Sequence, residues 1–305
     1  MKRAPCIGIA LGSGAARGWA HIGVLRALAR EGIEPQVISG CSIGAFVGAV
    51  AAANDLEKLG AWVEALGWQE VVGLMDMGLR GGLIKGDKLI SFFERNFVDR
   101  DFTALTHNFA CVATDLQNGH EVWLREGSVS AAVRASIAMP GLMRPSWQDG
   151  RLLVDGGLVN PVPVSLARAM GADIVIAVDL NSDLVGAALR RRDEAEPRPE
   201  PGTGGWSRKL LSRFGRTGAG SAEDSPSADE PAGLPSMLSV MHGSITIMSV
   251  RIARSRLAGD PADVLISPRL AQIGIMDFHR GAEAIAEGEA AVELMMPAIR
   301  RALGR

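Results

Sequence analysis

The chain of 305 residues has few of the residues that mark several other protein classes. Its 32 Lys and Arg against 34 Asp and Glu give a formal net charge of −2, which excludes a broad basic surface for nucleic acid. The three cysteines, Cys6, Cys41 and Cys111, lack paired spacing and predict buried thiols in a reducing compartment. No Cys-x-x-Cys pair or histidine cluster accompanies them, so we expect no metal site.

Long apolar runs are also missing. About six apolar-leaning residues follow the basic start at residues 1–5, too few for the core of a signal peptide. No run of about 18 uncharged apolar residues occurs elsewhere. We therefore expect a cytoplasmic protein, with transient peripheral contact at the inner membrane as the alternative.

What the chain does contain is an alternation of apolar strands and helices. Residues 6–11 predict a buried strand, apolar residues between 17 and 30 recur at helical spacing, and Val37–Ser39 predicts a second strand. The unbroken apolar run Ile174–Val178 is typical of a central parallel strand. The order predicts an α/β fold with a mainly parallel, doubly wound sheet between two helical layers, mostly in one large domain.

Helices and two hairpins are expected between these strands. Residues from about 55 to 100 look mainly helical, with a helix over 89–97. Asn118-Gly119 is a strong turn signal between strands at 109–114 and 120–124. A second turn at Asp149-Gly150 leads into a strand at 152–154.

The composition changes abruptly at residues 187–233. This stretch is dense in Pro, Gly, Ser, Glu and Asp, so it cannot bury enough apolar surface to offset its ordering entropy. It predicts a disordered insertion or linker, in which Trp206 to Phe214 could form a short docking helix. It separates a core at 5–182 from a helical part at 234–305 that completes the same domain.

The C-terminal part predicts two helices. In the first, an apolar stripe indicates a core or oligomer contact, with a membrane-surface role less favoured. The last helix, at 278–303, has Asp277 as its expected cap and Pro297 as its expected kink. The stripe consists of Met237, Met241, Ile245, Met248 and Ile252.

The most informative motif is Gly40-Cys41-Ser42-Ile43-Gly44, which follows the second strand. This G-x-S-x-G order is typical of a nucleophile elbow, a tight strand-to-helix turn that exposes a serine hydroxyl. Five residues with three fixed positions form a weak pattern by themselves, so a serine nucleophile also needs a partner base.

The five histidines are the first place to look for that base, and none lies at a strand-end turn. His21 is the hardest to dismiss, because one helical turn separates it from Gly18. Asp155 follows a predicted strand and precedes Gly156-Gly157. Partial burial would raise its pKa toward that of a base. A turn aspartate that caps the two glycines is the equally weighted alternative.

Ester hydrolysis also requires donors for an oxyanion. The glycine-rich segment from Gly12 to Gly18 offers backbone N–H groups at the start of a helix. A phosphate-binding loop of a dinucleotide fold is the alternative. The third glycine comes one residue late for G-x-G-x-x-G, and no acidic residue ends the second strand, so the oxyanion interpretation is favoured.

With these three motifs in this order, the chain resembles the patatin-like phospholipases, and most of all the bacterial members related to neuropathy target esterase. The similarity runs through residues 7–18, 40–44, 131–145 and 154–163. It covers about residues 5–182 and, more faintly, 235–305.

The resemblance implies a patatin-like three-layer α/β/α fold with Ser42 as nucleophile and Asp155, from the family's D-G-[GA] motif, as its dyad partner. The family loop is often G-G-G-x-[KR]-G, whereas Ser13 and Ala15 replace two of its glycines here. The oxyanion hole implied by the resemblance involves the backbone of Ser13, Gly14 and Ala15, with Arg17 beside it to hold the loop or attract an anionic head group.

These motifs predict a serine hydrolase of acyl esters that needs no metal or cofactor, and the resemblance implies that it acts on phospholipid or lysophospholipid. A soluble short-chain carboxylesterase or thioesterase is one alternative, and a non-catalytic lipid-binding or regulatory protein on the same fold is another. Oligomerisation is left open.

Overall fold

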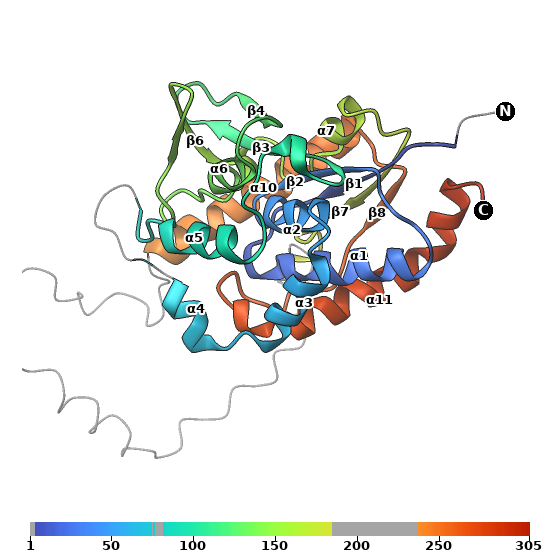
Figure 1. The fold of residues 1–305 in the computed structure, drawn as a ribbon, viewed down its shortest axis with the longest axis horizontal. Helices are drawn as coiled ribbons and strands as arrows, with labels where there is room; N and C mark the ends of the chain where they lie inside the picture. Colours follow the sequence, from blue (N-terminus) through green and yellow to red (C-terminus); the bar gives the residue numbers. More distant parts are fainter. Residues whose placement is uncertain (1–3, 75, 77–81, 185–236) are drawn as a thin grey trace, which may run out of the picture.

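The computed structural model describes residues 4–74, 76, 82–184 and 237–305, and the fold is drawn in Figure 1. The expected disordered insertion at 187–233, with its docking helix, lies outside these residues. Eight strands form one sheet in the order β5-β6-β3-β2-β1-β7-β8, with β4 paired to β3. The strands are β1 Ile7–Leu11, β2 Val37–Cys41, β3 Asn108–Asp115, β4 Glu121–Leu124, β5 Ser146–Gln148, β6 Arg151–Asp155, β7 Ile174–Val178 and β8 Val264–Ile266.

The sheet is mixed and mostly parallel. Strands β3-β2-β1-β7-β8 are parallel to one another, so Ile174–Val178 is an interior parallel strand, between β1 and β8. Both predicted hairpins are present as the antiparallel pairs β3-β4 and β5-β6. Strand β2 extends two residues beyond the predicted end at Ser39, because Gly40 and Cys41 still pair with β3.

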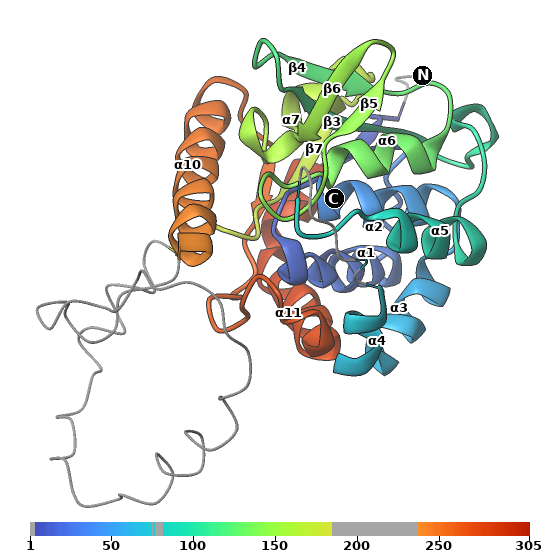
Figure 2. The same ribbon diagram turned by 90° about the vertical axis from the view of Figure 1, so that its left-hand side faces the viewer.

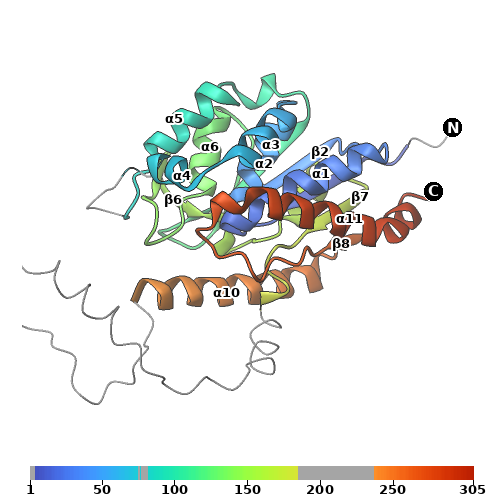
Figure 3. The same cartoon turned by 90° about the horizontal axis from the view of Figure 1, so that it is seen from below.

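Helices cover both faces of the sheet, which gives the predicted three layers (Figure 3). Alternate residues of β1 face opposite layers: Ile9 and Leu11 join the core under α1, α2 and α11, and Ala10 joins the core under α7 and α10. The helices are α1 Ala20–Arg30, α2 Ile43–Ala52, α3 Leu56–Ala65, α4 Trp68–Leu74, α5 Asp87–Asn96, α6 Val129–Ser136, α7 Val164–Ala169, α10 Met237–Gly259 and α11 Gly281–Ala302.

Residues of the C-terminal part join the same sheet and core. Strand β8 pairs with β7, and α11 packs along α1. The first helix differs from the prediction, because residues 15–19 form a 3-10 turn before α1 begins at Ala20.

The prediction that the side chain of Asp277 caps the last helix was wrong. Asp277 precedes the 3-10 turn Phe278–Arg280, but its side chain caps no helix and instead accepts the N–H of Gly274 at 2.9 Å. Helix α11 runs through Pro297.

The apolar stripe predicted for α10 was also wrong in one respect. Met248 is 51% exposed, and the buried face carries Ser249, Val250 and Ala253 instead. The helix packs against the turn that follows β6, where Ser249 Oγ donates to the carbonyl of Gly157 at 3.2 Å. A small polar residue therefore faces inward, because this turn presents a backbone acceptor.

Candidate active site

Ser42 occupies a strained turn between β2 and α2, at φ 55° and ψ −124°. A side chain in this region is uncommon and marks a conformation that the surrounding packing enforces. The turn is closed so tightly that a Cβ on Gly44 would lie 2.1 Å from the carbonyl oxygen of Leu11, and one on Gly40 would lie 2.6 Å from that of Gly44. The strand-to-helix geometry expected for residues 40–44 is thus present.

Ser42 is hydrogen-bonded to Asp155. Its Oγ donates to Asp155 Oδ2 at 2.6 Å, and the other carboxylate oxygen accepts the N–H of Gly157 at 2.7 Å. The two alternatives weighed for Asp155 therefore hold together: one oxygen caps the glycine turn and the other reaches the serine. Burial raises the pKa of Asp155 to about 6, against the lowering effect of these two hydrogen bonds.

The register of β3 explains why residues 113 positions apart meet. Cys41 pairs with Val112, and Asp155 pairs with the next residue, Ala113. Strand β4 occupies one side of β3 over residues 111–114, so β2 and β6 must share the other side, end to end. Ser42, which directly follows β2, therefore lies beside the last residue of β6.

Ser136 is a further contact that the sequence motifs did not assign. Its hydroxyl accepts the N–H of Ser42 at 2.9 Å and donates to the carbonyl of Val112 at 2.7 Å. The residue ends α6 within the stretch 131–145, which resembles the patatin family, and that resemblance was the signal that could have found it. Ser136 holds the elbow against β3.

The three loop residues expected to supply oxyanion donors differ in their availability. The N–H of Ser13 is bonded to the carbonyl of Pro161 at 2.9 Å and is not free for an oxyanion in this conformation. The N–H groups of Gly14 and Ala15 have no acceptor within the described residues, and Ala15 adopts a positive φ of 50°. At the start of α2, the N–H of Ile43 is likewise without an acceptor there.

Arg17 lies behind this loop. Its Nε donates to the carbonyl of Ile273 at 2.9 Å and its Nη1 to Asn181 Oδ1 at 2.7 Å. Asn181 Nδ2 in turn donates to the carbonyl of Ser13 at 2.9 Å. Burial lowers the pKa of Arg17 and the negative charge of Asp183 opposes this effect, but the residues described include no salt bridge to Arg17. Arg17 is thus connected to the loop through Asn181.

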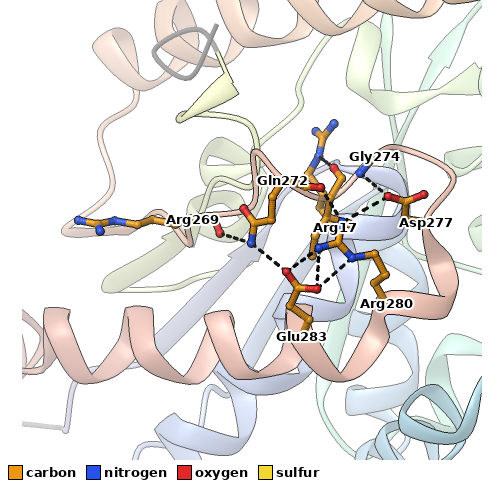
Figure 4. Close-up of polar contacts among 8 residues, drawn as sticks. Arg17, Arg269, Gln272, Gly274, Asp277, Arg280 and Glu283 are labelled. Atoms are coloured by element: carbon orange, nitrogen blue, oxygen red, sulfur yellow. Dashed lines mark hydrogen bonds and ion pairs between the residues drawn. The ribbon is translucent and has the colours of Figure 1, made fainter. Parts of the chain in front are cut away.

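The segment between β8 and α11 forms the wall that Arg17 holds (Figure 4). Arg280 anchors it by pairing with Glu283 at 2.7 Å and donating to the carbonyl of Gln272 at 2.6 Å. The carbonyl of Ile275 accepts the N–H of Ala16 at 3.2 Å. This wall was not foreseen, because the contacts that join it to Ala16 and Arg17 link residues more than 250 positions apart.

Ser42 lies between two cavities. The larger, of about 130 Å³, is lined almost wholly by apolar side chains from the helical layer. The smaller, of about 40 Å³, is lined by the loop at 13–17, Asp155, Asn181 and one side of α10. The apolar wall consists of Ala15, Trp19, Ile43, Phe46, Trp62, Leu66, Val71, Leu74, Ile84, Leu89, Ile137, Met139, Leu142, Met143, Met276 and Phe278.

His21 does not enter this site as a base. It is fully buried, with Nε2 2.8 Å from the carbonyl oxygen of Gly12, and burial lowers its pKa to about 4. Cys41 is also buried, and burial raises the pKa of its thiol. Both groups are therefore neutral at physiological pH, and the hydrogen-bonding partner of the Ser42 hydroxyl is Asp155.

Within the described ranges, no three His, Cys, Asp or Glu side chains gather as metal ligands would. The described helices also include none with the length and apolar character needed to cross a bilayer.

Comparison with known proteins places the chain in a family. The family model described as "Patatin-like phospholipase" matches residues 9–168 of the chain. An uncharacterized NTE family protein of Mycobacterium tuberculosis is 36% identical over 330 residues, covering 94% of this chain and 90% of the relative. Mouse patatin-like phospholipase domain-containing protein 7 is 35% identical over 60% of this chain, which spans 14% of the mouse protein. The solved structure of VipD from Legionella pneumophila is similar at a TM-score of 0.39 and 13% identity, covering 97% of this chain and 77% of that one. The family model matches residues 9–168, and the alignment with the mycobacterial relative covers most of both chains. The chain therefore belongs to the patatin-like phospholipase family.

Proposed function

We propose that this protein is a serine esterase that hydrolyses the acyl esters of phospholipids or lysophospholipids with a Ser42–Asp155 dyad. Membership of the patatin-like phospholipase family supports lipid acyl hydrolysis. The observation that carries the residue assignment is the hydrogen bond of 2.6 Å between Ser42 Oγ and the buried carboxylate of Asp155.

In the proposed mechanism, Asp155 Oδ2 takes the Ser42 proton as Oγ attacks the ester carbonyl carbon. The negative charge that develops on the carbonyl oxygen is bound by the N–H groups of Gly14, Ala15 and Ile43. When the tetrahedral intermediate collapses, the leaving alkoxide takes the proton from Asp155, and acyl-Ser42 remains. Water then gives a proton to Asp155 while its oxygen attacks the acyl carbon. When this second tetrahedral intermediate collapses, the leaving Ser42 Oγ takes the proton back from Asp155, which releases the fatty acid and restores the free enzyme.

The apolar cavity is the proposed acyl site. At about 130 Å³ it approaches the engineered cavity of about 150 Å³ that accepts benzene, so it has room for about six carbon atoms. Burying each methylene there contributes about 0.8 kcal/mol. This wall supports an acyl ester with a fatty chain over a small polar ester, because a short acyl group would leave apolar surface unfilled.

The smaller cavity is the proposed leaving-group site. Arg17 lines it with a buried guanidinium that has no ion pair in the described part of the chain. Asp183 acts electrostatically on this guanidinium without forming a salt bridge with it in the described residues. The cation lining the cavity therefore favours an anionic leaving group over a neutral one. This supports a phospholipid or lysophospholipid head group as the substrate portion on that side.

Labelling with a serine-reactive fluorophosphonate tests the dyad. We expect the wild type to label, Ser42→Ala to remain unlabelled, and Asp155→Asn to label at least 100-fold more slowly, in the range that loss of a general base causes. Asp115→Asn is the matched control, because Asp115 is also a buried turn aspartate that accepts a backbone N–H at 2.9 Å. Equal labelling of wild type, Ser42→Ala and Asp155→Asn would refute the dyad.

A further inference from the structure

Helix α10 is a basic helix with apolar residues on both sides. Its 23 residues include three arginines and no Asp or Glu. A helix that packs on one side and meets water on the other normally places polar residues outward. Here Val240, Ile247 and Met248 are 51%, 60% and 51% exposed. Figure 2 and Figure 3 show α10 along the outer edge of the described part of the molecule.

These exposed groups form one surface. Val240, Ile247, Arg251 and Arg254 follow one another at intervals of seven, four and three residues, which places them on a single side of the helix, with Met248 at its flank. The side chains of Arg251 and Arg254 are exposed. We call this the outer face of α10: apolar in its first half and cationic in its second.

The two arginines of the outer face differ in their contacts from Arg256, the third arginine of α10. Neither makes an ion pair within the described residues. Arg254 acts electrostatically on Asp179, which is itself buried. Arg256, by contrast, pairs with Glu121 at 2.6 Å and donates to the carbonyl of Val159. Within the described part of the chain, the outer face therefore presents two arginines that no carboxylate contacts as a salt bridge.

The charge pattern selects the occupant. A second copy of α10 offers no carboxylate to Arg251 and Arg254, because the helix contains none. The surface of a bilayer with anionic phospholipids supplies phosphates for the arginines and a shallow apolar layer for Ile247 and Met248.

The opposite side of α10 borders the candidate active site. Ile245, Thr246 and Ser249 line the small cavity beside Ser42. A protein docked through α10 therefore holds that cavity within one helix diameter, about 10 Å, of the lipid surface. We propose that the outer face of α10 docks the protein on bilayers that contain anionic phospholipid. The benefit of this docking rests on the proposed function, because docking brings lipid close to Ser42. The docking itself requires no turnover.

Co-sedimentation with vesicles tests the proposal on the full-length Ser42→Ala protein, which cannot consume the lipid by the proposed route. The probes are vesicles of phosphatidylcholine alone and of phosphatidylcholine with phosphatidylglycerol. We expect binding to the anionic vesicles that weakens with salt. Each arginine near an anionic surface is worth about five-fold in partitioning, so Arg251→Gln with Arg254→Gln should weaken binding about thirty-fold.

Matched variants separate docking from general charge effects. Arg125→Gln with Arg301→Gln removes two other exposed arginines and should leave vesicle binding unchanged. Ile247→Ser with Met248→Ser should weaken binding even at high salt, because it removes the apolar part of the contact. Equal loss in the Arg125/Arg301 control, or unchanged binding in the Arg251/Arg254 variant, would overturn the proposal.

Two further outcomes are decisive. Sedimentation velocity would overturn docking in favour of a second copy if the protein dimerises and Ile247→Ser abolishes the dimer. Hydrolysis of soluble p-nitrophenyl butyrate keeps docking apart from catalysis: with Ser42 intact, the Arg251/Arg254 variant should retain this activity and lose hydrolysis of anionic vesicles. A protein that binds these vesicles but shows no Ser42-dependent hydrolysis would refute the proposed function and leave docking supported.

Discussion

The buried carboxylate of Asp155 should make the protein less stable at the pH where it is active. Burial raises its pKa from 3.8 to about 6. The pKa of Asp155 is higher in the folded state than in the unfolded state, so protonation of this carboxyl favours folding. This contribution of Asp155 to the free energy of unfolding is fully present below about pH 3.8 and is lost as the pH rises through about 6. The difference of about two pKa units corresponds to about 3 kcal/mol of unfolding free energy.

Asp155→Asn removes the charge and retains the shape. An amide can still accept the N–H of Gly157 and form a hydrogen bond with Ser42, so few contacts are lost. We therefore expect the unfolding free energy of Asp155→Asn, measured relative to wild type, to rise by about 3 kcal/mol between about pH 4 and pH 8. Urea unfolding followed by circular dichroism at several pH values measures this difference.

Ser42→Ala provides the opposing control. The hydrogen bond from Ser42 lowers the pKa of Asp155. Because Ser42→Ala removes this bond, the pKa of Asp155 should rise further in the variant. Both variants should lack esterase activity, but at about pH 8 Asp155→Asn should be more stable than wild type and Ser42→Ala less stable. A stability difference between Asp155→Asn and wild type that does not change with pH would refute the burial of an ionisable Asp155.

Three further predictions follow from the site. The value of kcat/KM for a soluble ester should fall as the pH drops through about 6, because Asp155 must be ionised to accept the Ser42 proton, and an unchanged rate at about pH 5 would contradict this. Across a series of p-nitrophenyl esters, kcat/KM should rise about four-fold per methylene up to about six acyl carbons and then level off, whereas a decline from the acetyl ester onward would exclude the apolar cavity as the acyl site. Ser136→Ala should lower kcat by at least ten-fold with little change in KM, because it leaves the N–H of Ser42 without its acceptor and loosens the elbow. Ser130→Ala, on the same helix, is the control. Equal kinetics in both variants would contradict the role of Ser136.

Much of the fold followed from local signals in the sequence. The strand at 174–178, the two hairpin turns and the tight turn at Ser42 depend on short-range properties: β propensity, turn residues and the glycines that permit close backbone approach. The apolar stripe of α10 was misplaced because periodicity identifies a helix but not the chemistry of the surface on which it packs. That surface is a turn whose Gly157 carbonyl accepts a hydrogen bond from Ser249.

In the candidate site, too, some features follow from local sequence motifs and others from tertiary contacts. The sequence by itself determined the serine in its elbow and the aspartate in its glycine turn, because each belongs to a motif of a few adjacent residues. Only the tertiary structure decided that they touch, since this depends on β2 and β6 meeting end to end along β3. It alone also decided that the N–H of Ser13 is used internally and that Ser136 holds the elbow. Hydrogen bonds of this kind join residues distant along the chain, and no local pattern encodes their geometry.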